Sequence, residues 1–271
     1  VLLNCQVDKI LTANGRVKGV RTADGQEFYA KKVISNADPV ATCRDLIGLD
    51  HIPQSYLNQF RQKRVSASTF NVYMGLARPW AEYGIDAHEI FVNRDFDLDG
   101  HYKLANQMVA PDEMVITCYN TILPEISPPD SSIVVLTSLM YGEPWYHVSP
   151  AAYVSEKQRL AESMIDMAEE VMPLRPYIEQ LETSSPLTNI RYANTLGGGI
   201  YGFSNASFNH TILRGNRGPL GGLHFVGAWA QPGGGFWPSI LSGHMVGFAV
   251  SQSLDKRARR RPPVGKLETG A

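Results

Sequence analysis

The sequence predicts a mixed α/β protein in which helices cover a mixed β-sheet, and three observations support this fold class. Two hairpin signals, Asn14-Gly15 and Asp24-Gly25, separate β-rich runs near the start of the chain. Four later runs are rich in β-branched and aromatic residues, which is typical of strands. Between them and the end of the chain, apolar residues recur at helical spacing from residue 155 to 172.

The opening segment, residues 6–36, has the pattern strand, turn, strand, turn, strand. Asn and Asp followed by Gly supply the positive-φ residues that tight hairpins need. We expect a three-stranded meander with these apolar positions: Val7, Ile10, Val17, Val20, Phe28, Val33 and Ile34. The run ends in Ser35-Asn36-Ala37-Asp38-Pro39, where we expect the chain to change domain.

The middle of the chain predicts a helical segment followed by a sheet. Residues 39–63 have helical character, with breaks at Gly48 and Pro53. Strands are expected at 67–76, 89–93, 114–122 and 132–141, separated by Pro, Gly and Asp clusters.

Two long helices are expected in the second half. The first begins at Ser155 as N-cap and ends at Pro173, with Leu160, Met164 and Met167 in its apolar stripe. The stripe is either core packing or, since Met adapts its shape, the lining of a lipid site. The second helix covers 238–254, and the basic Pro/Gly-rich tail at 255–271 is expected to be disordered.

Composition excludes several classes of function. The 25 basic and 26 acidic residues leave a net charge of -1, so no overall field attracts nucleic acid. The three cysteines, Cys5, Cys43 and Cys118, have no CxxC spacing, which argues against disulfides and structural zinc and favours the cytoplasm. The histidines are scattered, so no metal site is predicted. No apolar run is long enough for a membrane-spanning helix.

The most informative segment is 223–243, which predicts a strand, a glycine turn and the start of a helix. Gly233, Gly234 and Gly235 remove every Cβ from the turn, so a flat ring or a phosphate can approach the backbone. Pro238 suits the first helical turn. The helix N-terminus favours a negative group. The alternative is a tight strand-to-helix connection without a ligand.

The motif GAWAQPGGGFWPSILSG, residues 227–243, resembles the carboxy-terminal flavin motif of the phytoene-desaturase-like family. The lead-in at 217–224 and the segment Gly199-Ile200-Tyr201-Gly202 are also similar to that family. At the other end, residues 7–38 resemble the hairpin and return strand of its cofactor domain. The resemblance implies a flavoprotein oxidoreductase that binds FAD.

The resemblance also implies site residues. It assigns cofactor binding to Val7, Asn36, Ala37, Gly227, Ala228, Pro232, Gly233, Gly234, Gly235 and Phe236. It suggests Trp229, Trp237 and Tyr201 as substrate contacts, although these aromatic side chains could equally pack in a core. The resemblance also implies that the central sheet forms a substrate-facing floor with Phe70, Tyr73, Met74, Leu139 and Tyr141, although strands always bury one face in a core. No catalytic residue is assigned, because the flavin carries the hydride chemistry.

The implied architecture is an incomplete FAD-binding Rossmann-like domain plus a substrate domain. Residues 1–38 and 189–254 would belong to the FAD-binding domain, 39–188 to the substrate domain, and 255–271 to the tail. The family's GxGxxG segment is absent from this chain and is expected to precede Val1. We therefore expect FAD binding by the intact protein and little or none by this piece alone.

Three functions follow as hypotheses. The first is an FAD-dependent oxidoreductase acting on an apolar polyene, such as a carotenoid or retinoid, by desaturation, saturation or isomerisation. The second is a flavin amine oxidase, and the third is a non-catalytic lipid-binding or interaction module. The basic run at 256–261 is either a peripheral anchor on an anionic membrane or a solvated tail. The sequence predicts no oligomeric state.

Overall fold

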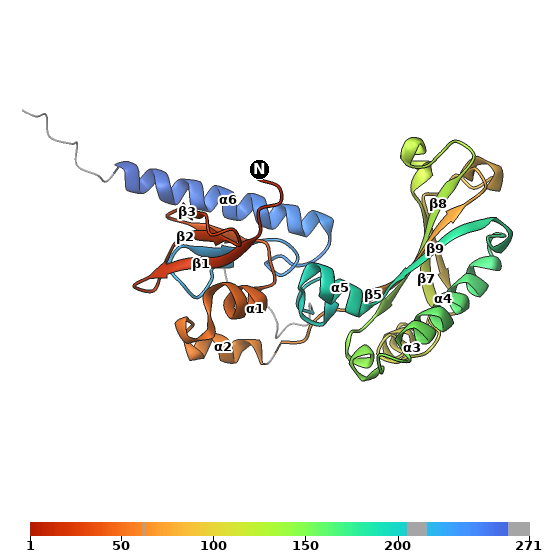
Figure 1. The fold of residues 1–271 in the computed structure, drawn as a ribbon, viewed down its shortest axis with the longest axis horizontal. Helices are drawn as coiled ribbons and strands as arrows, with labels where there is room; N and C mark the ends of the chain where they lie inside the picture. Colours follow the sequence, from red (N-terminus) through yellow and green to blue (C-terminus); the bar gives the residue numbers. More distant parts are fainter. Residues whose placement is uncertain (62, 205–215, 260–271) are drawn as a thin grey trace, which may run out of the picture. The chain divides into compact units, whose positions relative to one another are not determined.

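The computed structural model describes residues 1–61, 63–204 and 216–259. It divides the chain into two compact units (Figure 1): unit 1 comprises residues 1–62 and 205–271, and unit 2 comprises residues 63–204. Both contain helices and strands, so the predicted mixed α/β class is confirmed. The division into cofactor and substrate domains at 38/39 and 188/189 stays a prediction.

Unit 1 begins with the expected antiparallel meander of β1 (Val7–Ala13), β2 (Arg16–Thr22) and β3 (Glu27–Tyr29). Gly15 and Gly25 have φ angles of 68° and 89° in the two turns. The expected third strand is divided, however. After β3 the chain starts β4 (Val33–Ser35), which leaves the meander and pairs in parallel with β10 (Leu223–Phe225). Residues distant in the sequence therefore share a two-stranded sheet.

The predicted helical segment is present and is broken where expected. It consists of α1 (Pro39–Ala41), a π-helical turn (Thr42–Ile47), a 3-10 turn (Leu49–His51) and α2 (Gln54–Phe60). Gly48 has a φ of 93°, which ends the π-helical turn. The buried Asp38 carboxylate caps α1 by accepting from the Val40 amide at 2.6 Å. These turns and the meander enclose an apolar core that includes Ile10, Cys43 and Phe225.

Unit 2 is built on one five-stranded sheet of order β6-β7-β8-β5-β9. The strands are β5 (Ser68–Leu76), β6 (Glu89–Asn93), β7 (Glu113–Cys118), β8 (Ser132–Met140) and β9 (Ile178–Ser184). All four strand pairings in this sheet are antiparallel. The parallel pairing of β4 with β10 lies in unit 1. The sequence analysis did not anticipate β9.

The described residues contain four further α-helices: α3 (Leu98–Leu104), α4 (Tyr153–Glu169), α5 (Pro186–Ala193) and α6 (Phe236–Arg259). Of these, α3 and α5 were not predicted from the sequence. The prediction of Ser155 as N-cap is wrong: the N-cap is Ala152, and the Ser155 hydroxyl donates to its carbonyl inside the helix. The helix starts early because the chain already turns at Ser149, whose hydroxyl accepts from the Ala152 amide.

Helix α4 contacts β5, β8 and β9 (Figure 1) and buries its stripe on one face of the sheet. Met164 and Met167 lie within this core, which favours plain packing over a lipid lining. Along β5, Phe70 and Met74 face the same core, although we expected them on the substrate floor with Tyr73 and Leu139. The latter two are 42% and 38% exposed on the other face, because strand side chains alternate.

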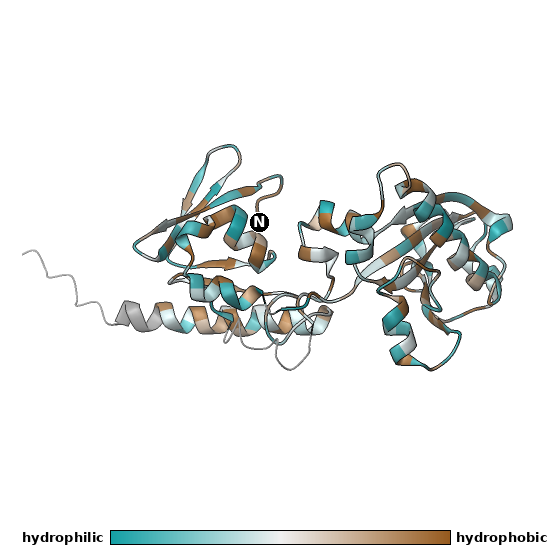
Figure 2. Ribbon diagram, turned by 90° about the horizontal axis from the view of Figure 1, so that it is seen from below, coloured by the Kyte–Doolittle hydropathy of each residue, from teal (hydrophilic) through white to brown (hydrophobic). Residues whose placement is uncertain are grey.

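Helix α6 continues beyond its expected end at residue 254 to Arg259. Hydrophobic and hydrophilic residues alternate irregularly along it (Figure 2). The remainder of the predicted disordered tail, from residue 260, lies outside the described residues. Among the helices of the described residues, none is both long enough and apolar enough to cross a membrane.

Candidate functional site

The glycine turn predicted from the sequence connects β10 to α6, as expected. β10 lies against β4, and the Val226 amide donates to the Ser35 carbonyl at 3.0 Å just beyond the paired strands. This pairing brings Asn36 beside Gly227, which has a φ of +84°. A Cβ on Gly227 would lie 1.8 Å from the Asn36 Oδ1, so any other residue would displace the Asn36 side chain and strain the backbone.

A buried serine attaches α6 to the end of β10. The Ser242 hydroxyl accepts from the Gly227 amide at 2.8 Å and donates to the Ser239 carbonyl at 2.7 Å. Ser242 is fully buried, so this short network is shielded from solvent. The helix axis is thereby fixed relative to the strand that precedes it.

The loop between Gly227 and α6 has its own support. The buried Asn216 side chain donates to the Gln231 carbonyl and accepts from the Gln231 amide, both at 2.8 Å. Gly233 and Gly235 have φ angles of 124° and 101°, which other residues rarely adopt. The Ser239 amide then donates to the Gly235 carbonyl at 3.1 Å. Pro238 has no N–H, and no acceptor among the described residues binds the Phe236 and Trp237 amides that open the helix.

The structure brings only some of the predicted cofactor residues together. Asn36 and Gly227 are adjacent, and Ala37 follows directly, with its amide donating to the Ser35 hydroxyl at 3.3 Å. Ala228 and the residues from Pro232 to Phe236 follow Gly227 in the same loop and helix start. Val7 lies in β1 opposite Thr22, in the meander. The cofactor role of all these residues stays a prediction.

The three predicted substrate aromatics have different environments. Trp229 is 6% exposed and buried in unit 1, whereas Trp237 is 69% exposed on α6. Phe236, at the start of the same helix, is 93% exposed. Tyr201 belongs to unit 2, where its amide donates to the Ser66 hydroxyl at 3.0 Å. Their roles as substrate contacts stay predictions.

The sequence analysis missed two residues that shape the site. Ser242 lies inside the quoted motif, but nothing in its spacing indicates that its hydroxyl binds the Gly227 amide. Asn216 has a φ of 55°, and an Asn in a Gly-rich loop is a weak signal for this left-handed conformation. Both act through contacts that depend on the tertiary fold.

Charges near the site are modest. Burial lowers the pKa of His224, and the positive charges of Lys32 and Arg217 lower it further. The His224 Nε2 lies 3.5 Å from the Lys32 ammonium. On the adjoining π-helical turn, burial and the Asp38 charge raise the pKa of Cys43 to about 12, so this thiol is not a nucleophile.

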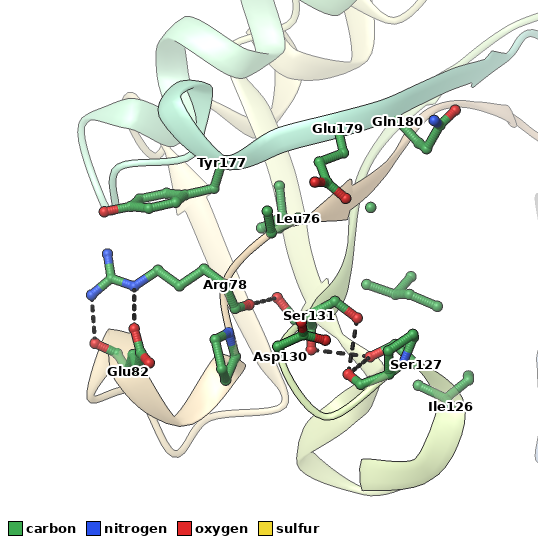
Figure 3. A pocket seen from close by; sticks show the side chains of 16 residues that line it. Leu76, Arg78, Glu82, Ile126, Ser127, Asp130, Ser131, Tyr177, Glu179 and Gln180 are labelled. Carbon is green, nitrogen blue, oxygen red and sulfur yellow. Dashed lines mark hydrogen bonds and ion pairs between the residues drawn. The ribbon is translucent and has the colours of Figure 1, made fainter.

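Unit 2 contains a separate open pocket of about 630 Å³ where β5 ends and β9 begins. Figure 3 shows Arg78 directed toward Glu82 below the ring of Tyr177, and the Arg78 Cζ lies 4.8 Å from that ring centre. Glu179 and Asp130 also line the pocket. Charged and apolar side chains share the lining, and none of the predicted site residues belongs to it.

Comparison with known protein families decides the relationship. The sequence profile of the family described as flavin containing amine oxidoreductase matches residues 1–246. The chain belongs to this family. The match confirms that the chain belongs to a family of flavin-containing oxidoreductases, as the sequence predicts.

The curated relatives are mostly enzymes of carotenoid chemistry. Prolycopene isomerase 2, chloroplastic, of an Oncidium hybrid cultivar is 26% identical over 94% of this chain and 42% of its own length. The lycopene-forming phytoene desaturase of Pseudescherichia vulneris is 28% identical over 89% of the chain and 49% of its own length. The resemblance to phytoene-desaturase-like proteins is confirmed. The chain spans about half the length of these relatives.

Solved structures share the fold. Cyclohexylamine oxidase from Brevibacterium oxydans IH-35A has a TM-score of 0.58 at 15% identity and covers 94% of this chain and 49% of its own. Putrescine oxidase bound to putrescine has a TM-score of 0.57 at 15% identity, covering 93% and 49% of the two chains. At this identity the likeness concerns the fold alone.

Proposed function

We propose that the protein containing this chain is an FAD-dependent oxidoreductase that desaturates, saturates or isomerises an apolar polyene. The observation that carries the proposal is the β10–turn–α6 arrangement, in which Gly227 packs against Asn36 and a glycine backbone precedes a long helix. The similarity to prolycopene isomerases and phytoene desaturases supports the polyene as substrate class.

The residues present fit a flavin. Gly233 and Gly235 hold conformations that exclude most side chains, so the turn offers bare backbone to a planar ring. A Cβ on Gly235 would find nothing nearer than the Pro238 ring at 3.5 Å, so packing within the chain does not require this glycine. Its φ of 101° is what requires glycine, and the missing side chain leaves the backbone open to a ligand.

The chain's own groups would orient the cofactor rather than react. The amides at the start of α6 favour the negative edge of a ring or a phosphate. Ser242 on α6 and Asn36 after β4 both contact Gly227, so they hold the start of the helix close to the end of the strand. When bound, FAD supplies the hydride acceptor or store. Phe236 and Trp237, both exposed on α6, offer apolar surface to a substrate and exclude water from it.

Flavin absorbance tests the cofactor part. We expect the intact protein to purify with an absorbance band near 450 nm and Gly234→Val to lower the flavin content at least tenfold, because its side chain occupies the backbone approach. Gly247→Val is the matched control: a Cβ there meets nothing within 4 Å. A colourless intact protein, or equal flavin loss in both variants, contradicts the proposal.

Product analysis tests the substrate. The flavin-loaded protein is incubated with a carotenoid in liposomes and, separately, with primary amines. We expect a change in the number or geometry of the carotenoid double bonds and no peroxide from amines. Amine-dependent peroxide with unchanged carotenoid would instead assign a flavin amine oxidase, and flavin-free carotenoid binding without turnover would assign a lipid-binding module.

Location and membrane contact follow as lesser proposals. A polyene dissolves in lipid, so the basic run at 256–261 would hold the protein on an anionic membrane surface from the cytoplasmic side. Sedimentation with phosphatidylserine vesicles checks this. Binding that is unchanged after replacement of the arginines in that run by glutamine contradicts it.

A further inference from the structure

The connection between β6 and β7 in unit 2 brings together one histidine and three carboxylates. His101 lies on α3 (Figure 1) and is only 5% exposed. Its Nε2 lies 2.9 Å from the Asp95 Oδ1 and 3.6 Å from the Asp112 Oδ2. Its Nδ1 lies 3.6 Å from the Glu113 Oε2. These residues come from both ends of the connection, so only the folded chain assembles them.

With protons alone, the buried His101 ring cannot give both of its nitrogens a suitable partner among the described residues. The buried Nδ1 has no hydrogen-bond partner among the described residues. If the ring is neutral with its proton on Nε2, the bare Nδ1 faces the Glu113 carboxylate. If the proton is on Nδ1, three lone-pair atoms converge with nothing positive between them. A doubly protonated ring still faces three carboxylates, so the cluster keeps excess negative charge.

We propose that Asp95, His101 and Asp112 bind a divalent transition-metal ion, with zinc as the first candidate. One ligand atom of each residue lies within 4.8 Å of the others. Zinc–ligand distances of about 2.0–2.2 Å place tetrahedral ligand atoms about 3.3 Å apart. The observed separations of 2.9 and 3.6 Å from Nε2 fall on either side of that value. Water would complete the fourth position.

Glu113 supports the same assignment from the other side of the ring. A histidine that binds a metal through one nitrogen usually donates from the other to a carboxylate, which fixes its tautomer. Here Nδ1 is the nitrogen left over, and the Glu113 Oε2 lies 3.6 Å from it, just beyond hydrogen-bond distance. The two ligand carboxylates would neutralise the ion, and Glu113 would orient the neutral ring.

The proposed metal ion would join the two ends of the segment that connects β6 to β7 and contains α3. The Arg94 amide already donates to the Asp112 carbonyl at 2.9 Å, which holds the two ends together. A metal bridging Asp95 and Asp112 would add a second closure, and His101 would link α3 to both. The role is therefore structural, separate from the β10–α6 turn, and does not rest on the proposed function.

Competition with a chromophoric chelator tests the site in the metal-stripped 271-residue chain. We expect one zinc ion per chain, micromolar or tighter binding, and a higher melting temperature with zinc. Asp95→Asn and Asp112→Asn should each weaken binding at least tenfold, and Glu113→Gln should weaken it less. Asp99→Asn, an exposed carboxylate on the same helix, is the matched control and should bind as the parent does.

Cobalt provides a second readout that depends on the ligand set. Co²⁺ in the parent chain should give visible d–d absorption bands typical of a tetrahedral N/O site, and Asp112→Asn should abolish them. Absence of saturable zinc binding overturns the proposal. Undiminished binding in both Asp95→Asn and Asp112→Asn overturns it equally, since the ion would then lie elsewhere.

Discussion

The two long helices, α4 and α6, are both rich in apolar residues but are held in place differently. α4 buries Leu160, Met164 and Ala168 completely against the sheet of unit 2. α6 buries Val246 but exposes Phe236, Trp237 and Phe248 within the described chain. The Ser242 hydroxyl accepts from the Gly227 amide and so attaches α6 to the end of β10. Apolar composition alone therefore does not reveal which helix stabilises its unit through the core.

The largest expected effect is a difference in stability between methionine-to-alanine substitutions on α4 and on α6. Met164→Ala should lower the free energy of unfolding of unit 2 by about 2–5 kcal/mol, because it leaves a cavity in a closed core. Met245→Ala on α6, where the side chain is 53% exposed, should change stability by less than about 0.5 kcal/mol. Urea denaturation of the two variants measures both values. Equal losses would contradict the contrast between the helices.

The second prediction concerns the start of α6. Gly227→Ala should destabilise unit 1 by about 1–3 kcal/mol from backbone strain, with the clash against Asn36 adding to it. The double variant Gly227→Ala with Asn36→Gly should recover the clash contribution only. Tryptophan fluorescence during denaturation follows unit 1 through Trp229 once Trp80 and Trp145 of unit 2 are replaced by phenylalanine. If the single variant is as stable as the parent, Gly227 and Asn36 are not packed as described.

A smaller loss is expected from removal of the polar attachment of α6. Ser242→Ala leaves the buried Gly227 amide without its acceptor, which should cost about 1–2 kcal/mol. Ser251→Ala, at an exposed position of the same helix, is the control and should be neutral. If Ser242→Ala is also neutral, apolar contacts hold α6 as they hold α4, and the comparison fails.

The smallest effect depends on pH. Because the folded-state pKa of His224 is lowered below its ordinary value of about 6.5, the unfolded chain binds more protons between the two pKa values. The stability of unit 1 should therefore fall as the pH drops below about 6.5. His224→Gln should reduce this slope. Thermal melts from pH 5 to 8 compare the slopes.

Local signals explain why parts of the fold could be predicted. The meander follows from two Gly turns, and the break in the first helical segment follows from Gly48. By contrast, β9 has the sequence IEQLETS, whose charged residues give little strand propensity. It becomes a strand by pairing with the edge of β5. Helix α3, with Gly100 in its interior, likewise depends on the Asp97 side chain that accepts from the Gly100 amide at 3.0 Å.

In the candidate site, too, features set by neighbouring residues could be predicted, whereas contacts between distant residues could not. Gly233, Gly235 and Pro238 carry their conformational preference within a few residues, so the sequence predicts the turn and the helix start. The contact between Asn36 and Gly227 depends on strands β4 and β10 from opposite ends of the chain. The gathering of Asp95, His101 and Asp112 was missed for the same reason, since their spacing matches no metal-binding motif.

The parallel pair β4–β10 also has a consequence for how the chain is made. Residues 33–35 leave the ribosome long before their partners at 223–225, and the whole of unit 2 is synthesised between them. The sheet of unit 2 needs no strand from outside residues 63–204, so it can close first. In unit 1, β4 stays without its partner strand until β10 has been synthesised. Premature termination before β10 would leave the backbone of β4 unpaired and prone to aggregation.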